Sequence, residues 1–262
     1  MAYYYHNDKP LYFQHQYLNA RDFVLPFTGY KEGDHVLEIG CGEGGVLKVY
    51  LDEGCTGVGV ELSPSKYRNA VKFLDQDIQN GKLVLYDENI YHEKFIKKFE
   101  GAFDLIILKD VIEHIYDQPK LLSRMKSFLK PGGKIFFGFP PWQMPFGGHQ
   151  QICRSRILNK LPYFHLLPYP LFKGLMKLFG ENEKTIKAMV EIKDTGISIE
   201  KFEKYLKKTG YDVDKDRFFI FNPIYKYKFG IQPRDQLKLI NHLPYIRDFV
   251  TTCAYYLVRS RE

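Results

Sequence analysis

The sequence predicts a doubly wound α/β fold, in which helices cover both faces of a mostly parallel sheet. Strand and helix patterns alternate along most of the chain from Val36 onward. A glycine-rich bend follows the first expected strand, at the edge where sheets of this kind bind ligands. The 262 residues suffice for one large domain or two small ones.

Short apolar runs bounded by turn residues indicate strands, and longer stretches with helical spacing indicate helices. The expected strands are His35–Ile39, Gly57–Glu61, Leu83–Tyr86, Phe103–Leu108, Lys134–Phe139, Phe218–Ile224 and Cys253–Arg259. The expected helices are Gly45–Asp52, Pro64–Asp75, Gln118–Leu129, Leu171–Leu178 and Ile199–Thr209, with one further helical stretch near Tyr17–Leu25. Ser63 before Pro64 is a typical helix start, and a Pro-Gly-Gly run ends the third helix.

Two segments interrupt this alternation. Residues 1–30 are rich in aromatic side chains, including Tyr3, Tyr4 and Tyr5, and form either a cap over the site or a helix on the sheet edge. The stretch at about 141–195 is too long for a simple connection, so we expect a helical lid insertion after the fifth strand. Its apolar side chains would wall an acceptor pocket or pack on themselves. Membrane contact by this basic, apolar segment is a third and less favoured interpretation, because no clean amphipathic stripe extends beyond Leu178. The remaining chain, 31–262, is expected to form the main domain.

Composition places few constraints on partners. The net charge is +7, but the lysines are spread along the chain, which favours a solvated surface over a nucleic-acid or membrane partner. The 4 cysteines form no C-x-x-C pair, so neither a disulfide framework nor a zinc knuckle is expected. The start lacks the pattern of a signal peptide. We therefore expect a cytoplasmic location, no nucleic-acid partner and no stable membrane insertion.

The glycine bend carries the first functional signal. Gly40 and Gly42 allow a tight turn and leave the main chain open to a ligand. With Gly45 they fit the dinucleotide-binding pattern, which alone is a weak signal. Glu38 argues against a pyrophosphate at this bend, because like charges repel, and it favours a ligand with an ammonium group.

Acids follow the next two strands. Glu61 ends the second strand about 20 residues after the bend, where an acid accepts hydrogen bonds from both ribose hydroxyls. Asp87 follows the third strand, where a carboxylate would accept from an exocyclic adenine amine. Together they indicate a bound nucleoside, without deciding which one.

Two further runs, Asp110–Ile115 and Leu129–Lys134, add to the signals of the glycine bend and the acids, and together these segments resemble one protein family. The series resembles the class I S-adenosylmethionine-dependent methyltransferases, in particular the small-molecule branch that includes ubiquinone-biosynthesis enzymes. The resemblance covers about residues 33–139 and is weaker at 199–259. It implies a Rossmann-like sheet of about seven strands with an antiparallel last strand, and S-adenosyl-L-methionine as cofactor.

The resemblance also implies roles for individual residues. The methionine moiety would be bordered by Glu38, Gly40, Cys41 and Gly42, and by the backbone of Lys109. The nucleoside would be held by Glu61 at the ribose, by Leu62 against the adenine, and by Asp87 with Glu88 at the adenine amine.

A small-molecule acceptor is expected, and its identity and the oligomeric state stay open. Methyl transfer needs mainly positioning, and a general base helps when the acceptor is a hydroxyl. His114 and His149 are the candidate bases. Some enzymes of this branch bind a divalent ion through acid-x-x-Glu-His. Here the first acid, Asp110, is shorter than the usual Glu, so no metal is predicted.

Two alternatives remain at this stage. An NAD-dependent oxidoreductase would use the same glycine bend and Glu61. A non-catalytic binding protein would keep the fold and lose the reaction. Nucleic-acid methylation lacks support, because the Asn/Asp-Pro-Pro-Tyr/Phe type of tetrapeptide is absent after the fourth strand.

Overall fold

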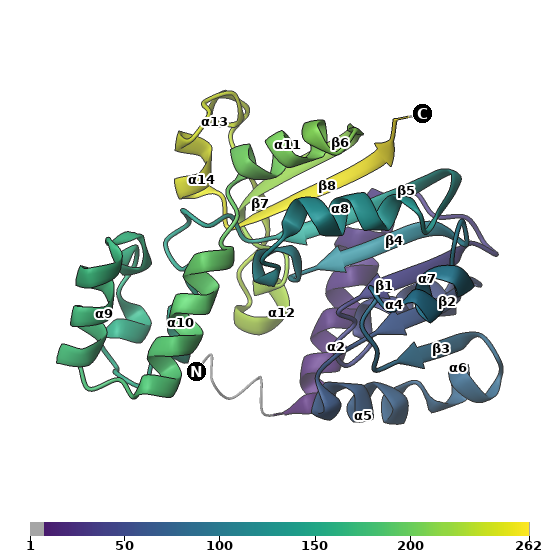
Figure 1. The fold of residues 1–262 in the computed structure, drawn as a ribbon, viewed down its shortest axis with the longest axis horizontal. Coiled ribbons are helices and arrows are strands. Elements are labelled where there is room, and N and C mark those ends of the chain that lie inside the picture. Colours follow the sequence, from purple (N-terminus) through teal and green to yellow (C-terminus); the bar gives the residue numbers. More distant parts are fainter. Residues whose placement is uncertain (1–7, 262) are drawn as a thin grey trace.

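A computed structural model describes residues 8–261; Met1–Asn7, with Tyr3, Tyr4 and Tyr5 of the expected cap, and Glu262 lie outside the described residues. A single mixed sheet organises the described chain (Figure 1). Its strands are β1 (His35–Ile39), β2 (Thr56–Val60), β3 (Leu83–Tyr86), β4 (Phe103–Lys109), β5 (Leu129–Phe139), β6 (Tyr211–Phe221), β7 (Arg234–Asp235) and β8 (Cys253–Ser260).

Helices cover the sheet and build two peripheral regions. Those before residue 130 are α2 (Lys9–Asn19), the π-helical turn η1 (Ala20–Val24), α3 (Leu25–Thr28), α4 (Gly45–Asp52), α5 (Pro64–Phe73), α6 (Asp75–Gln79), α7 (Glu93–Lys98), the 3₁₀ turn η2 (Ile112–His114) and α8 (Gln118–Lys126). Those after it are α9 (Tyr169–Leu178), α10 (Glu183–Thr195), α11 (Ile199–Lys208), α12 (Tyr225–Phe229), α13 (Lys238–Asn241) and α14 (Ile246–Val250), with short 3₁₀ turns at Gln150–Ile152, Leu158–Lys160 and Phe164–Leu166.

The strand order is β3-β2-β1-β4-β5-β8-β6-β7. Strands β1 to β5 pair in parallel, and β8 pairs antiparallel with both β5 and β6. The doubly wound fold and the antiparallel last strand are therefore confirmed. The sheet has eight strands among the described residues, because the two-residue β7 adds to the seven that were expected.

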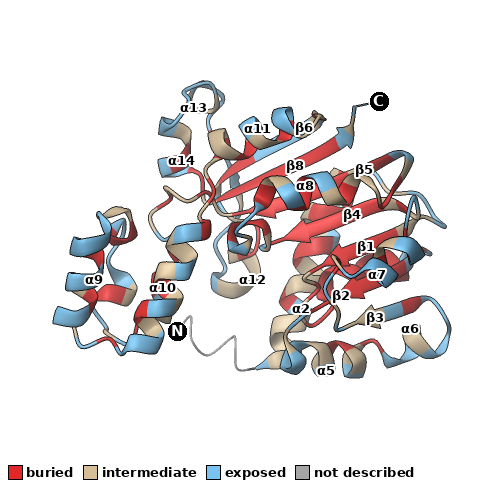
Figure 2. Cartoon of the chain, viewed as in Figure 1, coloured by how far each residue is buried: buried red, intermediate tan, exposed pale blue. Residues whose placement is uncertain are grey.

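Both faces of the sheet are buried, as the continuous apolar strands predicted. On β4, Ile106 and Leu108 belong to a core with α7, α8 and α11, whereas Leu105 and Ile107 belong to a core with η1 and α4. Figure 2 shows the buried strands between these two helical layers. Burial on both sides fixes the strand register, and so fixes where the residues at the carboxyl ends of the strands lie.

Two boundaries predicted at the fifth strand were wrong. The helix expected to reach Leu129 ends at Lys126, and β5 begins at Leu129, five residues before the predicted start. Leu129 pairs with Phe103, and the register then shifts so that Lys134 pairs with Leu105. The Pro-Gly-Gly run is thus an irregularity within the strand. The glycines signalled a break, but the ladder resumes beyond it.

Strand β6 also starts earlier than predicted, at Tyr211 instead of Phe218. Its first half is charged, which concealed it from an apolar pattern. The charges are satisfied across strands: Asp214 lies 3.0 Å from Lys134 and 3.2 Å from Arg259. A register shift at this acid allows one carboxylate to meet both cations.

The N-terminal segment is an integral part of the fold. Ala20 and Val24 are fully buried in the core with α4, and α2 packs closely on the start of α4. A Cβ added to Gly45 would lie 2.6 Å from the backbone oxygen of Phe13 and 2.9 Å from Cβ of Gln16. The third glycine of the bend is therefore needed for helix packing.

The insertion between β5 and α11 has its own core, as one of the sequence interpretations held. Its buried side chains are Cys153, Leu158, Phe164, Phe172, Met176, Ile186 and Met189. Its two ends are tied together, because Trp142 N donates to Ile197 O at 2.9 Å. Its second end is also tied to α8, because Gln118 Nε2 donates to Thr195 O at 2.6 Å. The helix α10 within it was not predicted; Asn182 caps its first turn. Among the described residues no helix is both long and apolar enough to cross a membrane.

We predict that Gly45→Ala destabilises the protein, although Ala normally favours a helix over Gly by about 1 kcal/mol. The added methyl group would push α2 away from α4, at a cost of about 1–3 kcal/mol in the free energy of unfolding. Chemical denaturation measures this change. Gly174→Ala is the matched control, because its new Cβ meets nothing within 4 Å. Equal effects of both substitutions would contradict the packing argument.

Candidate functional site

The bend after β1 exposes bare backbone. Gly40, Gly42 and Gly44 all have positive φ, of 71°, 59° and 87°. Gly40 N and Cys41 N both donate to Val60 O, at 2.8 and 3.0 Å, which ties the bend to the end of β2. A Cβ on Gly42 would meet nothing within 4 Å. The chain is thus open at Gly42, where a ligand can lie against it.

Glu61 holds the bend from the neighbouring strand. One of its carboxylate oxygens accepts from Gly42 N at 2.9 Å, and the other accepts from Ser63 N at 2.7 Å. Glu61 directly follows β2, one residue beyond the strand end that was predicted to include it, and is buried there. Each oxygen keeps a further lone pair for a ligand hydroxyl. Sequence reasoning predicted the ligand role and missed this structural one.

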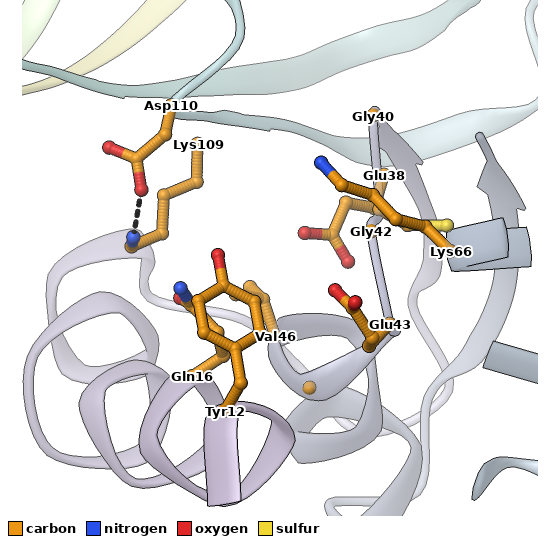
Figure 3. A pocket seen from close by; sticks show the side chains of 12 residues that line it. Tyr12, Gln16, Glu38, Gly40, Gly42, Glu43, Val46, Lys66, Lys109 and Asp110 are labelled. Atoms are coloured by element: carbon orange, nitrogen blue, oxygen red, sulfur yellow. Dashed lines mark hydrogen bonds and ion pairs between the residues drawn. The ribbon is translucent and has the colours of Figure 1, made fainter. Parts of the chain in front are cut away.

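A pocket of about 460 Å³, counting the solvent space at its mouth, lies over the bend (Figure 3). It is lined by Tyr12, Gln16, Glu38, Gly40, Cys41, Gly42, Glu43, Gly45, Val46, Lys66, Lys109 and Asp110. The structure therefore brings together five of the nine predicted cofactor residues: Glu38, Gly40, Cys41, Gly42 and Lys109.

Glu38 is the most deeply buried acid of this pocket. Only 2% of its surface is exposed, and one carboxylate oxygen accepts from Leu47 N at 3.0 Å. Burial raises the pKa of Glu38 to about 8, although the Leu47 hydrogen bond and the charge of Lys109 oppose the shift. Figure 3 shows its carboxyl group turned toward the space between the bend and Lys109. A cationic ligand group there would favour the ionised form.

Lys109 contributes its side chain as well as its backbone. Its ammonium group is buried and lies 2.6 Å from a carboxylate oxygen of Asp110. Burial alone would lower the pKa of Lys109, but the charge and hydrogen bond of Asp110 outweigh it and raise the pKa. Asp110 has a positive φ of 57°, an uncommon conformation that often marks functional sites. The same pair keeps the pKa of Asp110 low.

Sequence reasoning missed five pocket residues, one of which is Val46 in the first turn of α4. Tyr12 and Gln16 come from α2, and only the packing of that helix on α4 brings them to the pocket. Glu43 is buried within the bend, 3.5 Å from the ammonium group of Lys9. Its place between two glycines of the motif was the available signal. Lys66 reaches in from α5.

The other four predicted cofactor residues, Glu61, Leu62, Asp87 and Glu88, lie outside the pocket lining. They belong to the same sheet edge, because Glu61 N donates to Tyr86 O at 3.0 Å and so joins the ends of β2 and β3. Leu62 is 61% exposed, and Asp87 is also exposed. Glu88 is half-buried, and one carboxylate oxygen lies 3.7 Å from Nδ1 of His92.

The two candidate bases are neighbours. The rings of His114, in η2, and His149, after β5, have centroids 5.0 Å apart. Glu113 joins them, and one potential metal-ligand atom of each residue lies within 4.8 Å of the others. Both carboxylate oxygens of Glu113 and Nε2 of His149 are buried without a hydrogen-bond partner in the described part of the chain.

This cluster fits a divalent cation in its ligand types and spacing. A buried carboxylate without hydrogen bonds is costly unless a cation or proton accompanies it. Asp110 is bound to Lys109, so the cluster consists of Glu113, His114 and His149.

We predict that Glu38→Gln makes stability less sensitive to pH. The folded protein keeps the proton of Glu38 up to about pH 8, whereas the unfolded chain releases it near the ordinary value of 4.5. The folded state therefore binds more protons between these values, so stability falls as pH rises. Thermal unfolding at pH 5 and pH 8 should show a smaller loss for the variant. Glu100→Gln, at an exposed position, is the control; a pH slope like that of the original protein in both variants would refute the argument.

Comparison with known proteins places this geometry in a family. A methyltransferase-domain family model matches residues 12–191. The ubiquinone biosynthesis O-methyltransferase of Coxiella burnetii (strain RSA 493 / Nine Mile phase I) is 30% identical over 106 residues, which are 40% of this chain and 43% of that protein. Phosphoethanolamine N-methyltransferase 2 of Caenorhabditis elegans is 33% identical over 114 residues, 43% of this chain and 25% of that protein. The chain thus spans less than half the length of these relatives.

A solved structure supports the fold. Geranyl diphosphate C-methyltransferase from Streptomyces coelicolor A3(2), in complex with Mg²⁺, geranyl diphosphate and S-adenosyl-L-homocysteine, is 14% identical with a TM-score of 0.58. The alignment covers 92% of this chain and 78% of that one. The family match removes the oxidoreductase alternative, since it covers well over half of the sequence. The chain belongs to the class I S-adenosylmethionine-dependent methyltransferases.

Proposed function

We propose that this protein transfers a methyl group from S-adenosyl-L-methionine to a small molecule. The observation that carries the proposal is the pocket at the bend, where open backbone at Gly42 lies beside the buried carboxyl group of Glu38. A cationic sulfonium amino acid joined to a nucleoside matches both features. Glu61 stands at the adjoining strand end with lone pairs for a ribose.

The charges of the pocket suit the zwitterionic end of the donor. Lys109 would take the methionyl carboxylate through its buried ammonium group. Glu38 and Glu43 would then face the ammonium and sulfonium groups. The exposed Leu62 offers an apolar surface for the adenine, with Asp87 and Glu88 beside it.

Methyl transfer requires little chemistry from the protein beyond this placement. The sulfonium is already activated, so the protein must hold the acceptor atom in line with the methyl group and exclude water. His114 and His149 lie past β4 and β5, at the carboxyl edge that also carries the donor pocket. From there a histidine would accept the proton of a hydroxyl acceptor.

The cluster that includes these two histidines would alternatively hold a divalent cation, although the sequence predicted no metal. Glu113, His114 and His149 would then be its ligands, and neither histidine would act as a free base. A cation bound there would act as a Lewis acid and orient an acceptor oxygen. These three side chains, which belong to the segments after β4 and β5, would hold the cation in place.

The acceptor is proposed only as a small molecule. The relatives are an O-methyltransferase of ubiquinone biosynthesis, a phosphoethanolamine N-methyltransferase and a geranyl diphosphate C-methyltransferase. They support a small-molecule acceptor and leave open whether oxygen, nitrogen or carbon is methylated. A cytoplasmic location and the lack of a nucleic-acid partner stay predictions.

We predict that Glu61→Ala lowers the affinity for S-adenosylhomocysteine by on the order of 10- to 100-fold, since it removes the ribose acceptor and the support of Gly42. Isothermal titration calorimetry measures the change, with Glu100→Ala as an exposed control. Transfer of labelled methyl groups to a metabolite extract tests the reaction itself. Absence of heat with the folded original protein would refute the donor assignment, and binding without any transfer would favour the non-catalytic alternative.

We predict that the protein binds one Mn²⁺ or Zn²⁺ ion and that His149→Ala abolishes this binding. The substitution removes one of three ligands, and a two-ligand remnant holds metal poorly. Equilibrium dialysis with elemental analysis gives the stoichiometry without an activity assay. His242→Ala, at an exposed histidine outside the cluster, should bind normally. Equal metal content in both variants would rule out the cluster as the site.

A further inference from the structure

Helix α9 of the lid has two apolar faces. Phe172 and Met176 are fully buried in the core of the lid, whereas Leu171 and Leu178 are 61% and 80% exposed. Leu171, Leu175 and Leu178 have i, i+4, i+7 spacing, so they form a second stripe on one side of the helix. Leu175, in the middle of this stripe, is partly buried against the lid core, so the exposed apolar surface comes from Leu171 and Leu178. Figures 1 and 2 show α9 at the outer end of the lid, away from the sheet, with exposed segments along it. The stripe therefore cannot wall the donor pocket.

The surrounding segment is strongly basic. Residues 150–180 contain no Asp or Glu, and their five basic residues are Arg154, Arg156, Lys160, Lys173 and Lys177. Lys173 and Lys177 stand on α9 itself and are exposed. Lys177 has one acidic neighbour, Glu183, 3.6 Å away on a highly exposed side chain, which neutralises little of the field. Ile157 and Leu161 add exposed apolar surface.

We propose that this outer face, formed by Leu171, Leu175 and Leu178 with Lys173 and Lys177, docks on an anionic phospholipid surface. Exposed leucines flanked by lysines, with only the exposed Glu183 as an acidic neighbour of Lys177, are what an interfacial helix needs. A second copy of the chain is a poor occupant, because two such faces would bring like charges together. Docking is peripheral, since α9 has only 10 residues.

The proposed docking does not rest on the proposed methyl transfer, but it would determine which side of the molecule faces the bilayer. The lid begins at the end of β5, where His149 follows the strand, and its base is tied at Trp142 and Ile197. An apolar acceptor dissolved in the bilayer would thus lie on the side of the molecule that carries the acceptor end of the site.

Sedimentation with vesicles tests the proposal. The protein should bind vesicles of phosphatidylcholine mixed with phosphatidylglycerol and bind much more weakly to phosphatidylcholine alone. Leu171→Ser/Leu178→Ser should lower the partition coefficient about tenfold or more. Lys173→Gln/Lys177→Gln should lower it about fivefold per charge, and added salt should mimic that loss. Leu239→Ser is the matched control, because this leucine of α13 is 76% exposed.

Three outcomes would overturn the proposal. These are no binding to the mixed vesicles, a loss caused by Leu239→Ser and not by the α9 variants, and self-association in light scattering that Leu171→Ser/Leu178→Ser removes. Calorimetry with S-adenosylhomocysteine keeps the two hypotheses separate. The α9 variants should bind it normally, and a failure of every form to bind it would refute the donor site alone.

Discussion

The carboxylate of Glu61 links the two strands on which the site depends. By accepting from Gly42 N and Ser63 N, it fixes the bend after β1 and the turn after β2 with one side chain. The bend needs this support because its glycines have positive φ and little intrinsic preference for one conformation. Val60 O adds two more hydrogen bonds from the bend. A backbone held in this way can stay free of side chains and still present one shape to a ligand.

The electrostatics of the pocket follow from the same arrangement. A bend built at the buried end of a parallel strand forces Glu38 out of water, and its pKa rises to about 8 as a result. Lys109 emerges from the adjacent strand β4 and is held by Asp110. The pocket thus has a carboxyl group that a nearby cation would ionise on one side and the ammonium group of Lys109 on the other. Such an arrangement favours a ligand that itself carries both signs, and it sacrifices some stability for that preference.

The sequence predicted the elements that rest on local pattern. The apolar strands β1 and β4, the bend and the acid at Glu61 could all be located, because their residue types are required by burial or by backbone geometry. The charged first half of β6 could not, since its cross-strand partners, such as Arg259 for Asp214, are distant in sequence. Tyr12 reached the pocket only through the packing of α2 on α4.

The lid shows a different limit of pattern reasoning. Its aromatic and aliphatic residues predicted burial, and Phe172 and Met176 are indeed buried in a core of its own. Leu171 and Leu178 come from the same short run but stand in water, because α9 packs through one side only. Whether an apolar residue is core or surface is decided by which helix face has a partner. That choice depends on α10 and on the tied base at Trp142, so only the assembled lid reveals the unpaired face.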